Sequence, residues 1–254
     1  MTEKSRFRTG KIIVDMFHSK TVEPRQHIVL LYGMLSNPPS ADDGAVQTLI
    51  KHKFAVWCPH YEGTFASDGV CTFDNAVESV ICAVKLMNGQ SALELFREKT
   101  VTWNPLPVIL AGSSFGASVA LVAGAKIPEI KNIVALAGPS DFRKQTNIKR
   151  YYGPWKNGWK QTWRISAAAW SRVSRKSPNI NPILYSKKLR EKNILLIHAI
   201  DDPVVNIAQS QTLYDALREG TGDHKLIKLQ GSVHLGIADI AHKKIIQEIL
   251  AVGS

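Results

Sequence analysis

A serine between two glycines is the strongest chemical signal in this sequence. Gly112, Ser114 and Gly116 form a G-x-S-x-G motif, with an apolar run at 108–111 before it and small apolar residues at 117–125 after it. When a buried strand turns sharply into a helix, the serine backbone is strained, and Cβ groups two residues to either side would collide. Glycine removes that collision, so the motif predicts an exposed, nucleophilic serine hydroxyl.

Further polar residues follow other predicted strands. Asp201 and Asp202 follow the strand that ends at Ala199, and His234 follows the strand that ends at Leu229. Ligands of an open parallel sheet bind at the carboxyl ends of its strands. We therefore expect these side chains to lie near the serine.

Each of these residues also has a purely structural interpretation. Asp202, which precedes Pro203, could cap a helix. His234 could be a buried structural histidine, and Gly33, after the strand that ends at Tyr32, could be only a turn. Together, however, serine, aspartate and histidine follow one of the chain orders known for serine triads, in which the histidine takes the hydroxyl proton.

The elements around these residues alternate between strand and helix. Apolar runs predict strands at 11–17, 27–32, 54–58, 108–111, 131–137, 193–199 and 225–229, and helical periodicity predicts helices at 41–53, 73–87, 117–125, 207–219 and 237–252. This alternation predicts an α/β fold with a mostly parallel, doubly wound sheet. The connection 88–105 is polar with some helical character, and no stretch resembles a linker, so we expect 1–254 to form a single domain.

The stretch 142–182 interrupts the alternation and is interpreted as an inserted, mainly helical cap. We expect a helix at 160–173, and the spacing of Trp159, Trp163 and Trp170 fits one helical face. These tryptophans could line an acyl or aromatic pocket, or they could only pack the cap onto the sheet. Residues 142–190 contain no Asp or Glu, although the whole chain carries a net charge of +11. Such a basic stretch could steer an anionic substrate, nucleic acid or an acidic surface, but a solvated cationic face is the interpretation we favour.

Composition narrows the classes of protein to which this chain can belong. The sequence lacks an apolar run long enough to span a membrane and a secretory h-region at its start. The 3 cysteines have no metal-ligand spacing and are interpreted as reduced thiols, which fits a cytoplasmic protein. No recognised nucleic-acid module is present, so no nucleic acid is expected as a partner.

With these motifs in place, the chain resembles the α/β-hydrolases. The matching segments are 32–34, 62–69, 112–116, 198–205 and 231–234, and the resemblance extends from about residue 11 to residue 252 apart from the cap. The chain is similar to small bacterial esterases and to the catalytic domains of prolyl-oligopeptidase-like proteins. The resemblance implies that the cap insertion covers the active site.

The resemblance also implies roles. Ser114 would be the nucleophile, His234 the general base, and Asp202, rather than Asp201, the acid that orients the base. The backbone N–H groups of Met34 and Phe115 would hold the oxyanion. No metal or organic cofactor is implied.

Two departures from the family pattern stand out. Tyr32 occupies the place where many relatives have histidine, and Ala199 follows His198 where glycine is common. Neither departure removes a reacting group. The resemblance thus predicts a hydrolase of small-molecule carboxylic esters, with a peptidase, acyltransferase or thioesterase using the same triad as the alternative. A non-catalytic binding protein with a basic cap surface is disfavoured by the intact triad.

Overall fold

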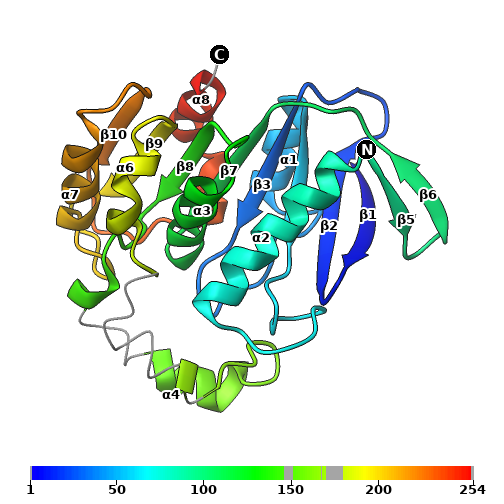
Figure 1. Ribbon diagram of the computed structural model, residues 1–254, viewed down its shortest axis with the longest axis horizontal. Helices are drawn as coiled ribbons and strands as arrows, with labels where there is room; N and C mark the ends of the chain where they lie inside the picture. Colours follow the sequence, from blue (N-terminus) through cyan, green and yellow to red (C-terminus); the bar gives the residue numbers. More distant parts are fainter. Residues whose placement is uncertain (1, 146–150, 167, 170–179, 253–254) are drawn as a thin grey trace.

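The computed structural model describes residues 2–145, 151–166, 168–169 and 180–252. Within them, the central strands are β1 (Thr2–Thr9), β2 (Ile12–Ser19), β3 (Gln26–Leu31), β4 (Phe54–Pro59), β7 (Val108–Ser113), β8 (Asn132–Leu136), β9 (Asn193–Ala199) and β10 (His224–Leu229). They form an eight-stranded sheet in the order β1-β2-β4-β3-β7-β8-β9-β10 (Figure 1). In this order, neighbouring strands from β4 across the sheet to β10 pair in parallel, whereas β2 is antiparallel to both β1 and β4. The prediction of a mostly parallel α/β sheet is confirmed.

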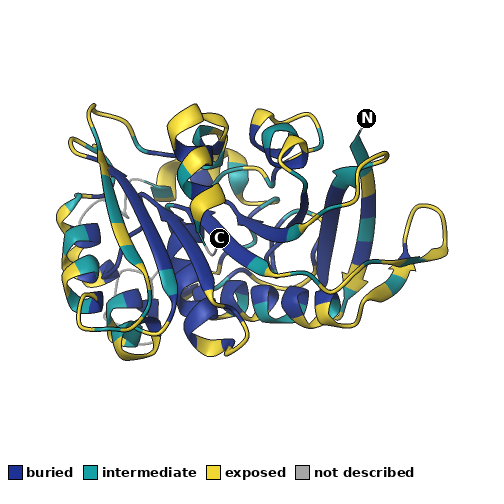
Figure 2. Ribbon diagram, turned by 90° about the horizontal axis from the view of Figure 1, so that it is seen from above, coloured by how far each residue is buried: buried dark blue, intermediate teal, exposed yellow. Residues whose placement is uncertain are grey.

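Helices cover both faces of this sheet. On one face lie α1 (Gly44–Lys51) and α8 (Lys243–Ala251), and on the other lie α2 (Phe73–Asn88), α3 (Phe115–Lys126), α6 (Ser186–Leu189) and α7 (Ala208–Leu217). Figure 2 shows the buried strands between these two layers, with the exposed helix faces outside. Every residue of α3 except Lys126 is buried, because a helix that is apolar all round must lie in the interior.

Two segments differ from their predicted structure. The strand β1 was not expected, and the polar connection 88–105 contains a small antiparallel hairpin, β5 (Ser91–Glu94) with β6 (Lys99–Thr102), instead of helical turns. Both are short or charged strands whose formation depends on partners elsewhere in the chain. Their own sequences carry little apolar periodicity.

The prediction of a helix at 160–173 is wrong over 160–166, whereas 168–169 are helical. Helical turns occur earlier, in α4 (Tyr152–Pro154) and in a π-helical turn, Trp155–Trp159. From 161 to 166 the chain is non-helical, and Trp163 forms a β-bridge with Thr64. Tertiary pairing therefore overrides the helical spacing of the tryptophans.

Residues 151–166, between β8 and β9, lie at the carboxyl edge of the sheet, where Figure 1 places α4. Backbone hydrogen bonds join them to the loop after β4. The N–H of Phe65 donates to the carbonyl of Thr162, the N–H of Arg164 to that of Gly63, and the N–H of Cys71 to that of Arg164, each over 2.8 Å. None of the described helices combines the length and apolar character needed to cross a bilayer.

Candidate active site

Ser114 stands at the junction of β7 and α3. Its backbone has φ 53° and ψ −120°, a conformation that is strained for a residue with a side chain. A hydrogen bond of 2.8 Å from its N–H to the carbonyl of Leu136 on β8 holds this turn in place. The side chain is half-buried at the carboxyl end of the strand.

The two flanking glycines permit this turn. A Cβ on Gly112 would lie 2.3 Å from the carbonyl oxygen of Gly116, and a Cβ on Gly116 would lie 2.1 Å from the carbonyl oxygen of Leu31. Contacts this short with backbone atoms exclude any side chain. The collision predicted from the motif would therefore occur if Gly112 carried a side chain. Gly116 must lack a side chain for a second reason, because β3 approaches it closely.

His234 and Asp202 lie in contact. The Nδ1–H of His234 donates to Oδ2 of Asp202 over 2.8 Å, because a carboxylate only accepts. When the imidazole is neutral, this bond leaves the lone pair on Nε2. That Nε2 atom is buried and has no hydrogen-bond partner among the described residues, Ser114 included. His234 is thus arranged as a proton acceptor with its accepting atom unoccupied.

Asp202 is held as an anion. Its Oδ1 accepts the backbone N–H groups of Val204 at 2.7 Å and Val205 at 3.0 Å. Burial alone would raise the pKa of Asp202, but the donors of His198, His234 and this backbone outweigh burial and hold the pKa well below its ordinary value. Asp201, by contrast, is exposed, and its carboxylate has no described partner.

His198 is a neighbour of Asp202 for which no role was predicted from the sequence. It is fully buried, and its Nε2 lies 3.2 Å from Oδ2 of Asp202. The same Nε2 donates to the carbonyl of Val205 over 2.8 Å, while Nδ1 lies 2.7 Å from Oγ of Ser210. The spacing of His198 and Asp202 across the strand end is the one sequence signal that could have indicated this contact.

The two predicted oxyanion donors lie beside the serine. Phe115 directly follows Ser114 at the start of α3, and a Cβ on Gly33 would lie 3.4 Å from the Cβ of Ser114. The hydroxyl of Ser36 donates to the carbonyl of Gly33 over 2.7 Å and so fixes the loop that carries Met34. Within the described part of the chain, the backbone N–H groups of Met34 and Phe115 have no acceptor.

Ser114 and His234 open into one cavity of about 560 Å³, a volume within the range of small-molecule sites. Met34 also lines it, whereas Phe115 is not among its lining side chains. Sequence reasoning missed two of its walls, Asp43 at the start of α1 and Tyr151 just before α4. The full lining comprises Tyr32, Gly33, Met34, Ser36, Asn37, Pro39, Asp43, Gly44, Ala45, Ser113, Ser114, Tyr151, Val204, His234, Leu235, Gly236, Ile237 and Ala238.

Trp163 lies away from this lining. It is 0% exposed, its ring contacts Tyr32, Tyr61 and Phe115, and its Nε1–H donates to the carbonyl of Ser36 over 3.2 Å. This placement ties the segment around Trp163 to the loop beside the serine.

The other two tryptophans are placed less fully. Trp159 is half-buried and does not line the cavity, and Trp170 lies outside the described residues. A substrate-binding role for the three tryptophans stays a prediction.

The tyrosine at the first departure from the family pattern has a structural task. The hydroxyl of Tyr32 is 2.8 Å from Oγ1 of Thr64 and accepts the N–H of Tyr61 over 3.2 Å. In return, the Tyr61 hydroxyl donates to the carbonyl of Tyr32 over 3.0 Å. Complete burial raises the pKa of Tyr32, so the ring remains a neutral clamp between the loops after β3 and β4.

Several basic side chains of the stretch 142–190 form ion pairs or hydrogen bonds within the protein. Arg143 pairs with Asp141 and Arg190 with Glu219, each at 2.7 Å, and Arg164 donates to loop carbonyls. Among the described residues, no cluster of His, Cys, Asp and Glu is placed to hold a metal ion.

Comparison with known proteins agrees with this geometry. The model of the prolyl oligopeptidase family matches residues 45–251. No curated protein matches the chain in sequence.

Solved structures share the fold at low identity. The esterase Pf2001 of Pyrococcus furiosus has a TM-score of 0.67 at 16% identity, with 98% of this chain and 89% of that chain covered. Est1E of Butyrivibrio proteoclasticus has 0.66 at 14% identity, with 98% and 99% covered. A puromycin-hydrolysing peptidase of Mycobacterium tuberculosis has 0.66 at 17% identity, with 98% of this chain but 38% of that chain covered. The family match covers most of the chain, and the chain therefore belongs to the prolyl oligopeptidase family and is a serine hydrolase with the α/β-hydrolase fold.

Proposed function

We propose that this serine hydrolase cleaves carboxylic esters through an acyl-enzyme intermediate. Nε2 of His234 takes the hydroxyl proton of Ser114 as Oγ attacks the ester carbonyl carbon. The N–H groups of Met34 and Phe115 receive the resulting oxyanion. The intermediate expels the alcohol, which leaves with the proton from His234, and a water then repeats the sequence to release the acid.

The observation that carries this proposal is the state of His234. Its Nδ1 is bonded to Asp202, its buried Nε2 has no partner among the described residues, and His234 lines the same cavity as Ser114. Two backbone donors beside Ser114 have no acceptor among the described residues, and they support the oxyanion assignment. Ester rather than amide chemistry is supported by Pf2001, which is named as an esterase and is matched over 89% of its own length.

The proposal also includes the cap. We infer that 142–182 forms a cap on a domain of residues 1–254, because Trp163 and Arg164 are bonded to loops at the carboxyl edge of the sheet and Tyr151 lines the cavity.

A single assay tests the reaction. Purified protein is expected to hydrolyse p-nitrophenyl acetate with an initial burst, and Ser114→Ala is expected to reduce kcat/KM by at least about 10³-fold with an unchanged melting temperature. Activity retained in the folded Ser114→Ala variant would overturn the proposal.

A peptidase is the second candidate, and Asp43 is the observation that favours it. Its carboxylate accepts the N–H of Ser40 over 2.8 Å and has no cationic partner among the described residues, although it lines the cavity. Such a carboxylate could bind the free amino group of a peptide. Faster hydrolysis of an aminoacyl p-nitroanilide than of its N-acetyl form, lost in Asp43→Asn, would establish this alternative.

A further inference from the structure

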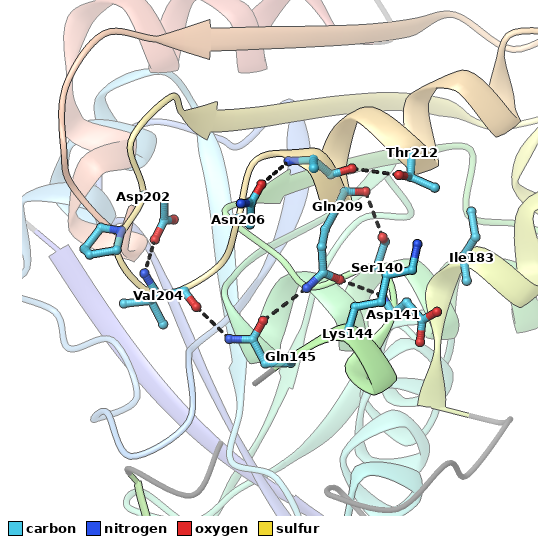
Figure 3. A pocket seen from close by; sticks show the side chains of 12 residues that line it. Ser140, Asp141, Lys144, Gln145, Ile183, Asp202, Val204, Asn206, Gln209 and Thr212 are labelled. Carbon is cyan, nitrogen blue, oxygen red and sulfur yellow. Dashed lines mark hydrogen bonds between the residues drawn. The ribbon is translucent and has the colours of Figure 1, made fainter. Parts of the chain in front are cut away.

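A second cavity lies on the other side of the loop that carries Asp202. It has a volume of about 460 Å³ and lies above the ends of β8 and β9 and the start of α7. Val204 lines both this cavity and the one around Ser114, so the two are neighbours. Figure 3 shows Asp202 and Val204 at one side of it and Lys144 beside Ser140 and Asp141 at the other.

The floor of this cavity is fixed by side-chain amides. Gln145 donates to the carbonyl of Val204 over 2.6 Å, and Gln209 donates to Oε1 of Gln145 over 3.1 Å. Oε1 of Gln209 accepts the N–H of Asp141 over 2.9 Å, and the carbonyl of Gln209 accepts the hydroxyl of Ser140 over 2.7 Å (Figure 3). Gln209, Ser140 and Asp141 are buried, so the floor of the cavity has its shape before a ligand enters.

Of the charged side chains around the cavity, Lys144 is the one without an ion-pair partner within the described residues. Both oxygens of Asp141 are bonded to Arg143, whose guanidinium lowers the pKa of Asp141. The Asp202 carboxylate is 0% exposed and faces two histidines. Lys144 itself is exposed. At the start of α7, the N–H of Ala208 donates to Oδ1 of Asn206 over 2.8 Å.

From this unpaired cation we propose that the cavity is a substrate subsite for a carboxylate, which Lys144 pairs with. This proposal rests on the proposed ester hydrolysis and names its substrate class: esters that carry a carboxylate on the chain extending past Val204. The ester carbonyl lies at Ser114, and the charged end crosses Val204 to reach Lys144. The side-chain amides of Gln145 and Gln209 are polar but uncharged, so they can lie beside the carboxylate of the substrate without forming an ion pair in place of Lys144.

Paired substrates test the subsite. The mono-p-nitrophenyl esters of glutarate, adipate and suberate are compared with the esters of pentanoate, hexanoate and octanoate in wild type, Lys144→Gln and the matched control Lys156→Gln. Lys156 is an exposed lysine of the same basic stretch that does not line the cavity. For each chain length, kcat/KM of the anionic ester is divided by kcat/KM of the neutral ester. At the chain length where this ratio is highest in wild type, it should fall about fivefold in Lys144→Gln through a higher KM for the anionic ester. A solvent-exposed ion pair contributes a free energy of that size.

A binding measurement separates failure of the subsite from failure of the chemistry. Calorimetry gives the Kd of Ser114→Ala, with and without Lys144→Gln, for monomethyl adipate and for methyl hexanoate. A weaker Kd for the anionic ester in the double variant supports the subsite even if wild type hydrolyses no ester, in which case the proposed function alone fails. An unchanged ratio and an unchanged Kd, or an equal loss in Lys156→Gln, would overturn the subsite.

Discussion

Nδ1 of His234 lies 2.8 Å from Oδ2 of Asp202, and that bond selects the imidazole tautomer whose Nε2 can accept a proton. Asn at 202 can turn its NH₂ toward Nδ1, which would stabilise the opposite tautomer. We therefore expect Asp202→Asn to lower kcat on the order of 10⁴-fold, as loss of the correct tautomer does in serine triads.

Asp201→Asn is the matched control for that substitution. Asp201 is exposed and has no described contact with His234, so its kcat should stay within about twofold of wild type, as for surface changes generally. Kinetics with an activated ester measure both variants. A larger loss in Asp201→Asn than in Asp202→Asn would show that the acid has been misassigned.

His198 is expected to position Asp202. Its Nε2, 3.2 Å from Oδ2 of Asp202, is one of the donors that lower the pKa of that acid. Without this donor, in His198→Phe, the pKa of Asp202 rises and the carboxylate protonates at a higher pH. The acid limb of kcat/KM against pH should move upward.

Ser210→Ala keeps the His198 ring and removes only the hydroxyl that lies 2.7 Å from its Nδ1. We expect a smaller shift of the acid limb in the same direction. If both variants lose stability while the acid limb stays in place, His198 serves only the packing of the interior.

Gly116 is expected to tolerate no side chain. A Cβ there would lie 2.1 Å from the carbonyl oxygen of Leu31, so Gly116→Ala should lower the free energy of unfolding by about 3 kcal/mol or more. Gly158, whose Cβ would meet nothing within 4 Å, supplies the control Gly158→Ala, which should leave stability nearly unchanged. Urea denaturation measures both, and an equally stable Gly116→Ala would contradict the described turn.

The buried carboxylate of Asp15 should make stability sensitive to acid. Burial alone would raise its pKa, but Arg6, bonded through Nε at 2.6 Å, and His60 beside it hold the pKa well below its ordinary value. This stabilisation is complete above the ordinary carboxylate pKa of about 4 and is lost as the pH falls toward the lowered value.

Asp15→Asn is therefore expected to cost about 3 kcal/mol near pH 7 and progressively less below pH 4, as urea unfolding at several pH values would measure. Asp68→Asn removes an ion pair with Arg8 in which the Asp68 side chain is 66% exposed, and little change is expected because water screens it. A gap between wild type and Asp15→Asn that stays constant with pH would contradict the ion-pair account.

The sequence allowed prediction of the parts whose signal is local. The strand and helix around Ser114 are recognisable because apolar runs and flanking glycines lie within a few residues of one another. The charged strand β1 was missed because its formation depends on β2, through Arg6 and Asp15. Trp163 was assigned to a helix because its spacing from Trp159 is helical, whereas its bridge to Thr64 depends on a loop far away in the chain.

The same distinction applies to the site. Ser114, Asp202 and His234 follow predicted strands, so the sheet rule places them at one edge. The contact of His198 with Asp202, and the contribution of Asp43 and Tyr151 to the cavity, depend on side-chain directions and on loop folding. No periodicity in the sequence carries that information.

The central claim is that Ser114 is an activated nucleophile. The most direct test is to treat the folded protein with a fluorophosphonate probe and to map the labelled peptide by mass spectrometry. We expect a single phosphonylated residue, Ser114, with labelling lost in His234→Ala because that variant lacks the base. Absence of label on Ser114 in the folded wild-type protein, or equal labelling of the His234→Ala variant, would contradict the account.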